Sequence, residues 1–284
     1  MNYLKKIIKG IFIGVANIIP GVSGGTMAVS MGIYDDIIYS ITHLKSEFKK
    51  SIKTLFPYII GMGVGLAVLS FVIKYLLENY TFETNMAFIG LILGGIPVML
   101  GRLKGKKLGI SNVIIFLVFF GLVIGMQLLG EGNGSSVVIK MSALEAVKLL
   151  LIGVIASATM VVPGVSGSMM LLLIGYYYPI LDAVTGIMKA VKNLDIPTVI
   201  DYSYILIPFG IGVVVGIFAI AKIIELLLKH YEGQTFSGIL GLVIASPLAI
   251  LMNSGLPEFD VPKVLISIVT FVIGLMVAYK LGEE

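Results

Sequence analysis

Two long apolar stretches of this chain are interrupted by nearly the same ten residues. The first copy, residues 18–27, reads Ile-Ile-Pro-Gly-Val-Ser-Gly-Gly-Thr-Met, and the second, residues 161–170, reads Val-Val-Pro-Gly-Val-Ser-Gly-Ser-Met-Met. Proline and glycine both disfavour the continuation of a helix. Each copy therefore predicts a break in an apolar helix, where backbone groups must be satisfied by protein or water. We infer a polar site built from the two breaks.

The apolar segments of the chain together predict an all-α polytopic membrane protein. Of the 284 residues, 58% are hydrophobic and 13% are charged, whereas soluble domains contain about 25% charged residues. The segments reach or approach the ~20 residues that a helix needs to cross a bilayer. They are residues 7–42 (broken at 20–25), 55–77, 85–101, 112–130, 146–188 (broken at 163–167), 205–228, 236–253 and 264–281.

The second half of the chain repeats the first. Matching Pro, Gly, Ser and Tyr residues are separated by 143 positions around the motif, and by 151 positions from Pro57 onward. Matches of these residue types at two constant offsets predict a duplication within one membrane domain, with units of about 1–135 and 142–284. The change of offset predicts a longer loop around residues 189–203 in the second unit.

The positions of the lysines predict that the two units are inverted relative to each other. Lysines flank segment 7–42, with Lys5, Lys6 and Lys9 at its start, so we expect it to enter and leave from the cytoplasm as a re-entrant hairpin. Its first arm, residues 7–19, would reach about 20 Å, less than the ~30 Å of a bilayer core. Three full spans follow, so the second unit begins outside and both termini are cytoplasmic.

This topology places 14 of the 20 Lys and Arg residues inside. Those expected outside are Lys74, Lys140, Lys148, Lys189, Lys192 and Lys263. Lys189 and Lys192 fit poorly, because they share one outer loop. The alternative is eight full spans in two parallel units of four.

The repeated motif offers hydrogen-bond donors to an anion. An apolar arm follows each break, and a helix start carries free N–H groups and a partial positive charge. Glycines allow successive N–H groups to converge, as they do around phosphate in soluble proteins. The candidate phosphate-binding residues are Gly21, Ser23, Gly24, Gly25, Thr26, Gly164, Ser166, Gly167 and Ser168. Two alternatives stay open: the motif only turns a tight corner, or carbonyls near Ile19 and Val162 hold Na⁺ or a proton-carrying water.

Polar residues inside spans are further candidates for lining a cavity or for coupling. They are Asn17, Lys74, Glu78, Lys222 and Glu225. The two Lys–Glu pairs lie one helical turn apart, so ordinary pairing at helix ends is the simpler explanation for them. Gln127 stands at the outer end of a span, where we expect exposure.

The sequence lacks the residue patterns that metal binding and several kinds of catalysis require. The chain contains no cysteine, and its two histidines stand near lysines at the ends of apolar runs. No spacing of His, Asp or Glu suggests a metal ligand set, and no nucleophile–base pair is apparent. We therefore expect no metal, no cofactor and no enzymatic activity. The basic residues act as topological signals, so we expect no nucleic acid partner.

The doubled Pro-Gly-Val-Ser-Gly, with Gly-Leu-Ile-Leu-Gly-Gly-Ile-Pro at residues 90–97, resembles a bacterial membrane family associated with transport of polyprenyl phosphate. The resemblance covers essentially the whole chain. It implies a flippase that returns undecaprenyl phosphate, the carrier lipid of cell-wall synthesis, from the outer to the inner leaflet of the cytoplasmic membrane. Two departures weaken the second unit: Ser168 replaces the Gly25 of the first copy, and residues 241–247 echo 90–97 imperfectly.

With this substrate, the two tips would meet near the middle of the membrane and share the phosphate. A charged head group alone in hydrocarbon is very costly, and inverted units could open the site to each leaflet in turn. The main alternative is an ion-coupled transporter or channel for a small ion that uses the same tips. An enzyme or a scaffold is disfavoured. The expected partners are polyprenyl phosphate, membrane lipids and, through small-residue helix faces, a second copy in a homodimer.

Overall fold

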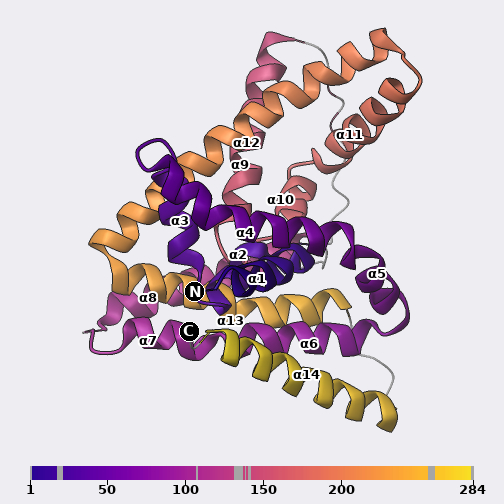
Figure 1. Ribbon diagram of the computed structural model, residues 1–284. Helices are drawn as coiled ribbons and strands as arrows, with labels where there is room; N and C mark the ends of the chain where they lie inside the picture. Colours follow the sequence, from indigo (N-terminus) through magenta and orange to yellow (C-terminus); the bar gives the residue numbers. More distant parts are fainter. Residues whose placement is uncertain are drawn as a thin grey trace.

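The computed structural model describes residues 2–17, 22–106, 108–130, 137, 139, 142–254 and 260–282, and its regular structure there is entirely helical (Figure 1). The predictions for Pro20 and Gly21 fall outside the described residues. The helices are α1 (Tyr3–Ala16), α2 (Gly24–Ser30), α3 (Tyr34–Thr42), α4 (Phe48–Ala67), α5 (Leu69–Asn79), α6 (Thr81–Gly94), α7 (Ile96–Leu103), α8 (Ile110–Gly130), α9 (Ala143–Val161), α10 (Gly167–Leu173), α11 (Tyr177–Lys192), α12 (Ile196–His230), α13 (Glu232–Ser254) and α14 (Val261–Gly282).

Membrane-length helices dominate the described part of the chain. Six are long and apolar enough to cross a bilayer: α6 with α7, α8, α9, α12, α13 and α14. Two bent pairs raise the number to eight if each counts as one span, namely α4 with α5, bent by 50°, and α10 with α11, bent by 114°. The prediction of an all-α polytopic membrane protein is confirmed.

The helix bounds recur at the two offsets seen in the sequence. α10 begins and ends 143 positions after α2, and α13 begins and ends 151 positions after the start of α6 and the end of α7. The packing recurs as well. α1 packs along α4 as α9 packs along α12, and α6 packs along α14 as α13 packs along α8. The last helix of each half therefore packs against the other half.

Glycines bring the paired helices close together at matching places. A Cβ atom added at Gly10 would overlap the backbone carbonyl of Tyr58, and one added at Gly153 would overlap that of Phe209. Helices within a bilayer gain most of their mutual attraction from such close packing, because lipid tails are as apolar as their side chains.

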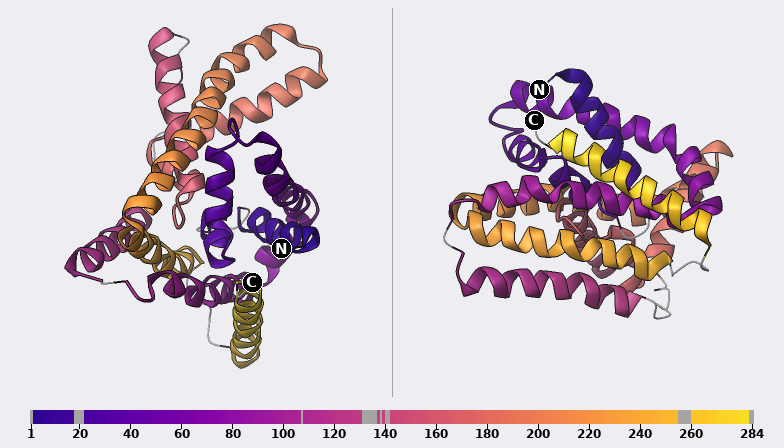
Figure 2. Two further views of the ribbon diagram at one scale, coloured as in Figure 1. Left: turned by 60° about the vertical axis from the view of Figure 1, so that its left-hand side comes forward. Right: turned by 90° about the horizontal axis from the view of Figure 1, so that it is seen from below.

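Both broken segments turn back on themselves. Figure 1 shows α9 running from the upper edge into the centre, and α10 and α11 running back toward the upper right. α1 and α3 extend instead toward the left, where the two chain ends also lie side by side (Figures 1 and 2). The 14 residues of α1 reach about 21 Å and the 19 residues of α9 about 28 Å. The second arm is thus longer than the first.

The expected loop around residues 189–203 is wrong, because the extra residues lengthen two helices. α11 runs to Lys192 and α12 starts at Ile196. The Asp195 side chain caps the start of α12, where it accepts a hydrogen bond from the Thr198 N–H at 3.3 Å. Such a cap satisfies an N–H group that has no partner within the helix.

Lys9 also differs from its expected place among the flanking lysines. The first helix begins at Tyr3, so Lys9 falls in its middle and is only 2% exposed. Its ammonium group donates to the Met31 carbonyl oxygen at 3.0 Å, just beyond the end of α2. A cation is favourable at the carboxyl end of a helix, where carbonyl oxygens are left without partners.

Candidate functional site at the two helix breaks

The two motif copies meet in the core, as the sequence predicts. The Gly164 N–H donates to Thr26 Oγ1 at 2.6 Å, across 138 positions of sequence. The Tyr34 hydroxyl, just after the first copy, donates to the Val161 carbonyl oxygen at 3.1 Å. Gly25 fits against the second copy, since a Cβ atom there would come within 3.1 Å of the same oxygen. The breaks form one buried joint.

In the first copy, protein atoms already satisfy several of the expected donors. Ser23 caps α2 by accepting from the Thr26 N–H at 3.4 Å. The Asn17 amide oxygen accepts from the Gly24 N–H at 3.2 Å, while its nitrogen donates to the Ile13 carbonyl oxygen. All residues of α2 are buried. Asn17 thus lies at the break, with its amide oxygen at a place where an anion could accept the same bond.

In the second copy, two hydroxyl groups are accessible. The Ser166 and Ser168 hydroxyl oxygens lie 3.0 Å apart, and Ser168 is exposed while Ser166 is half-buried. Gly164 has φ of +79°, a conformation that favours glycine. Gly167 packs near the Thr159 hydroxyl, which a Cβ atom would approach to 3.0 Å. The two copies therefore differ: the first is buried and internally bonded, and the second presents hydroxyl groups.

The helices that follow the breaks are short. α2 and α10 have seven residues each, about 10 Å of helix. Their aligned peptide dipoles add up to little, so any attraction for an anion comes mainly from local hydroxyl and N–H donors.

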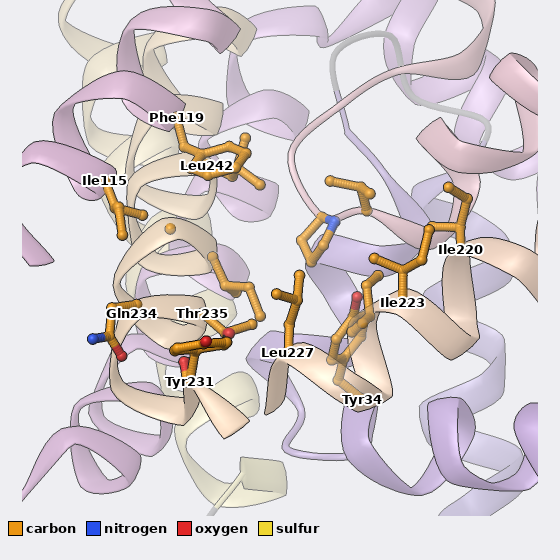
Figure 3. Close-up of a pocket in the computed structure, with 15 residues that line it drawn as sticks. Tyr34, Ile115, Phe119, Ile220, Ile223, Leu227, Tyr231, Gln234, Thr235 and Leu242 are labelled. Carbon is orange, nitrogen blue, oxygen red and sulfur yellow. The ribbon is translucent and has the colours of Figure 1, made fainter. Parts of the chain in front are cut away.

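Cavities lie on both sides of the second tip. A cavity of about 420 Å³ is bounded by Val162 and Pro163 and by α8, α12 and α13 (Figure 3). A second, of only about 10 Å³, is lined by Gly164, Ser166 and Gln127. The smaller one is at the limit for a single water molecule. The second tip therefore separates a large space from a nearly closed one.

The charged candidates lie away from this joint. Lys74 and Glu78 form an exposed ion pair on α5, with 3.7 Å between Nζ and Oε1. Lys222 pairs with Glu225 on α12 at 2.6 Å, and Glu225 also lies 3.3 Å from His43. Glu225 lines a separate cavity together with Asp35 and Lys229. Of the further candidates, the structure brings only Asn17 to the tips.

Three residues near the site were not assigned a role from the sequence. Tyr34 is one of the tyrosines that recur at the offset of 143, matching Tyr177, but the sequence does not predict that its hydroxyl group links the two copies. Lys9 looked like a flanking charge. Gln127 was expected to be exposed, yet it is buried and hydrogen bonds with Asn253 of α13. These contacts join distant segments, so local patterns do not reveal them. Over the described ranges, no group of three His, Asp or Glu residues could hold a metal ion.

A bundle of membrane-length helices, with two broken segments that meet at a buried joint beside a cavity, defines a multi-pass membrane protein. A family model described as undecaprenyl phosphate translocase-like matches residues 13–264, and the chain belongs to this family.

Two relatives match most of the length of this chain. A polyprenyl-phosphate transporter of Staphylococcus aureus is 34% identical over 98% of this chain and 95% of its own length. A polyprenyl-phosphate transporter of Vibrio cholerae is 32% identical over 87% of this chain and 77% of its own. Both are named as transporters rather than enzymes. No solved structure matches the chain.

Proposed function

We propose that this chain carries polyprenyl phosphate, and undecaprenyl phosphate in particular, from the outer to the inner leaflet of a bacterial cytoplasmic membrane, with both termini in the cytoplasm. The observation that carries the proposal is the hydrogen bond from the Gly164 N–H to Thr26 Oγ1, which joins the two motif copies. The names of the two relatives support the substrate.

The joint supplies the kind of donors that a phosphate group accepts from. The Ser166 and Ser168 hydroxyl groups can turn from each other toward an anion. The N–H groups of Gly24 and Gly164 are now bonded to the Asn17 and Thr26 side chains, which a phosphate oxygen would replace. Competition from these protein acceptors would keep binding loose enough for release, as transport requires.

The surroundings of the joint suit a lipid that crosses head group first. The second tip separates a large cavity from a nearly closed one, so moving the tip would change the side from which the joint is reached. Corresponding helices also differ in shape: α12 is continuous over 35 residues, whereas α4 and α5 meet at a bend. Repeated units held in different conformations are typical of alternating access. We propose that residues 1–135 and 142–284 are such units, with inverted topology.

The wall of the large cavity favours a lipid over a small ion. Its lining is mainly aliphatic and aromatic, and an isolated ion in such surroundings loses its hydration without compensation. A lipid phosphate needs polar partners for its head group only. Transport without chemical change accounts for these features, so the proposal includes no enzymatic step.

The test is transport in proteoliposomes made with the purified protein. Removing a donor with Ser166→Ala, or with Ser168→Ala, should slow the transfer of undecaprenyl phosphate between leaflets. A hydrogen bond to a charged group contributes about 1.5–3 kcal/mol, so we expect roughly a tenfold to hundredfold decrease. Thr185→Val is the matched control, because its hydroxyl bonds within α11, away from the tips.

Two outcomes would contradict the proposal. One is unchanged transfer in both donor variants. The other is transfer that millimolar inorganic phosphate abolishes while a soluble polyprenyl phosphate analogue leaves it unaffected, which would favour a small-ion site.

A further inference from the structure

The large cavity beside the second tip has a markedly apolar wall. Figure 3 shows Phe119 and Leu242 on one side and Ile220 and Ile223 on the other, with Leu227 between them. The cavity runs along α12 from Ile220 to Tyr231, the residue just after the helix ends. At 1.5 Å per residue this is about 16 Å. Its volume of about 420 Å³ lies within the range of small-molecule sites, about 300–1,000 Å³.

One end of the cavity reaches the joint between the two motif copies. Val162 and Pro163 of the second copy form part of its wall, and so does Tyr34, whose hydroxyl bonds to Val161. The next residue, Gly164, donates to Thr26. A molecule in the cavity would therefore have its apolar part along α12 and its end at the polar joint.

The side of the cavity opens toward lipid. Ile223 is 51% exposed, and Phe119 and Leu227 are exposed as well. All three belong to helices that are long and apolar enough to span a bilayer, so these exposed faces meet acyl chains. A long chain in the cavity could continue into the bilayer without leaving an apolar environment.

We propose that this cavity binds the phosphate-proximal isoprene units of the prenyl chain while the head group is at the tips. The inference rests on the proposed function. The polar joint at one end and the lipid-facing side along α8 and α12 match an amphipathic molecule whose chain is too long to be enclosed. Inorganic phosphate would leave the wall unused, and a second protein chain would not account for the polar end.

Photo-crosslinking tests the position of the chain. A photoreactive phenylalanine analogue replaces Ile223 in the full-length protein, and vesicles contain undecaprenyl phosphate among phospholipids. The control is the same replacement at Val72, which lies 151 positions earlier on α5 and is 50% exposed. We expect adducts with undecaprenyl phosphate to form several times more at position 223 than at position 72, and an excess of unlabelled undecaprenyl phosphate to suppress them. Equal labelling at both positions would overturn the proposal. So would labelling at position 223 in which phospholipid adducts are as abundant as adducts with undecaprenyl phosphate.

A binding measurement with two probes tests the energetics. Ile223→Trp should lower the affinity for undecaprenyl phosphate by about fourfold or more, because each methylene excluded from an apolar site costs about that factor. The affinity for butyl phosphate, which has the head group without the long chain, should stay unchanged, and Val72→Trp should affect neither probe. An equal decrease for both probes would overturn the proposal, since Ile223 would then act on the tips. Size-exclusion profiles like that of the wild type establish that the variants fold.

The two proposals can fail separately. Preferred labelling at position 223 in a protein that does not move undecaprenyl phosphate between leaflets would leave the chain site standing and refute the transport function. Transport without preferred labelling would refute the chain site and leave the function standing.

Discussion

At the scale of residues, Gly164 is the position where the second motif copy has the least freedom. Its φ of +79° is unfavourable for residues with a Cβ atom, and such an atom would lie 2.7 Å from the Leu242 carbonyl oxygen. Gly105 has nearly the same φ, +81°, but has open space around it. Comparing Gly164 with Gly105 therefore separates the effect of backbone strain from the effect of crowding.

We therefore predict that Gly164→Ala lowers the free energy of unfolding by about 2–5 kcal/mol, the sum of left-handed strain and overpacking. Gly105→Ala should lower the free energy of unfolding only by the contribution of left-handed strain, about 1–2 kcal/mol. Thermal unfolding in detergent, followed by size exclusion, measures both. Equal losses of stability in the two variants would show that Leu242 does not crowd this position.

At the scale of elements, the packing of α9 against α12 depends on one face of each helix. A Cβ atom at Gly212 would overlap the Leu150 carbonyl, whereas Gly210, two residues earlier on α12, has no neighbour within 4 Å. Gly61 and Ile7 make the corresponding contact between α1 and α4. Both halves thus use a glycine to seat the first arm of a hairpin against a long helix.

We predict that Gly212→Leu separates α9 from α12 and destabilises the protein by about 1–3 kcal/mol, the usual cost of overpacking. It should also slow transport, because α9 ends at the second tip. Gly210→Leu, on the open face of the same helix, should leave both properties within error. The interface assigned here would be wrong if the two variants behaved alike in thermal unfolding and in transport.

At the scale of the whole molecule, the topology is open to a direct test, because the chain has no cysteine of its own. Lys104 ends α7 and Asn193 ends α11, and both residues are exposed. The inverted arrangement places the first inside and the second outside. It also assigns Lys189 and Lys192 to the outer side, against the usual preference of lysine.

We predict that a membrane-impermeant maleimide labels Asn193→Cys in intact cells, and labels Lys104→Cys only after the cells are permeabilised. Comparing the two variants within one experiment controls for leakage. Labelling of both in intact cells, or of neither, would place the two connections on the same side and end the inverted arrangement. Formation of a homodimer stays a prediction that this experiment does not address.

The features that could be predicted from the sequence all follow from local physics. The apolar segments required membrane helices, because only helices satisfy every backbone group within one segment in lipid. The two Pro-Gly motifs required breaks, and α9 does end at Val161, two residues before Pro163 of the second Pro-Gly. The constant offsets predicted the matching helix bounds of the two halves. Each conclusion depends on neighbouring residues or on a repeat visible in one dimension.

Which donors are already bonded, and which groups lie beside them, depends on long-range packing. Thr26 meets Gly164, Lys9 reaches Met31 and Gln127 meets Asn253, and each contact joins segments that local sequence cannot relate. The eight extra residues of the second half became helix rather than loop, because α11 and α12 extend toward each other. The apolar cavity lies between α8, α12 and α13, and the space that packed helices leave between them is a property that no single segment encodes.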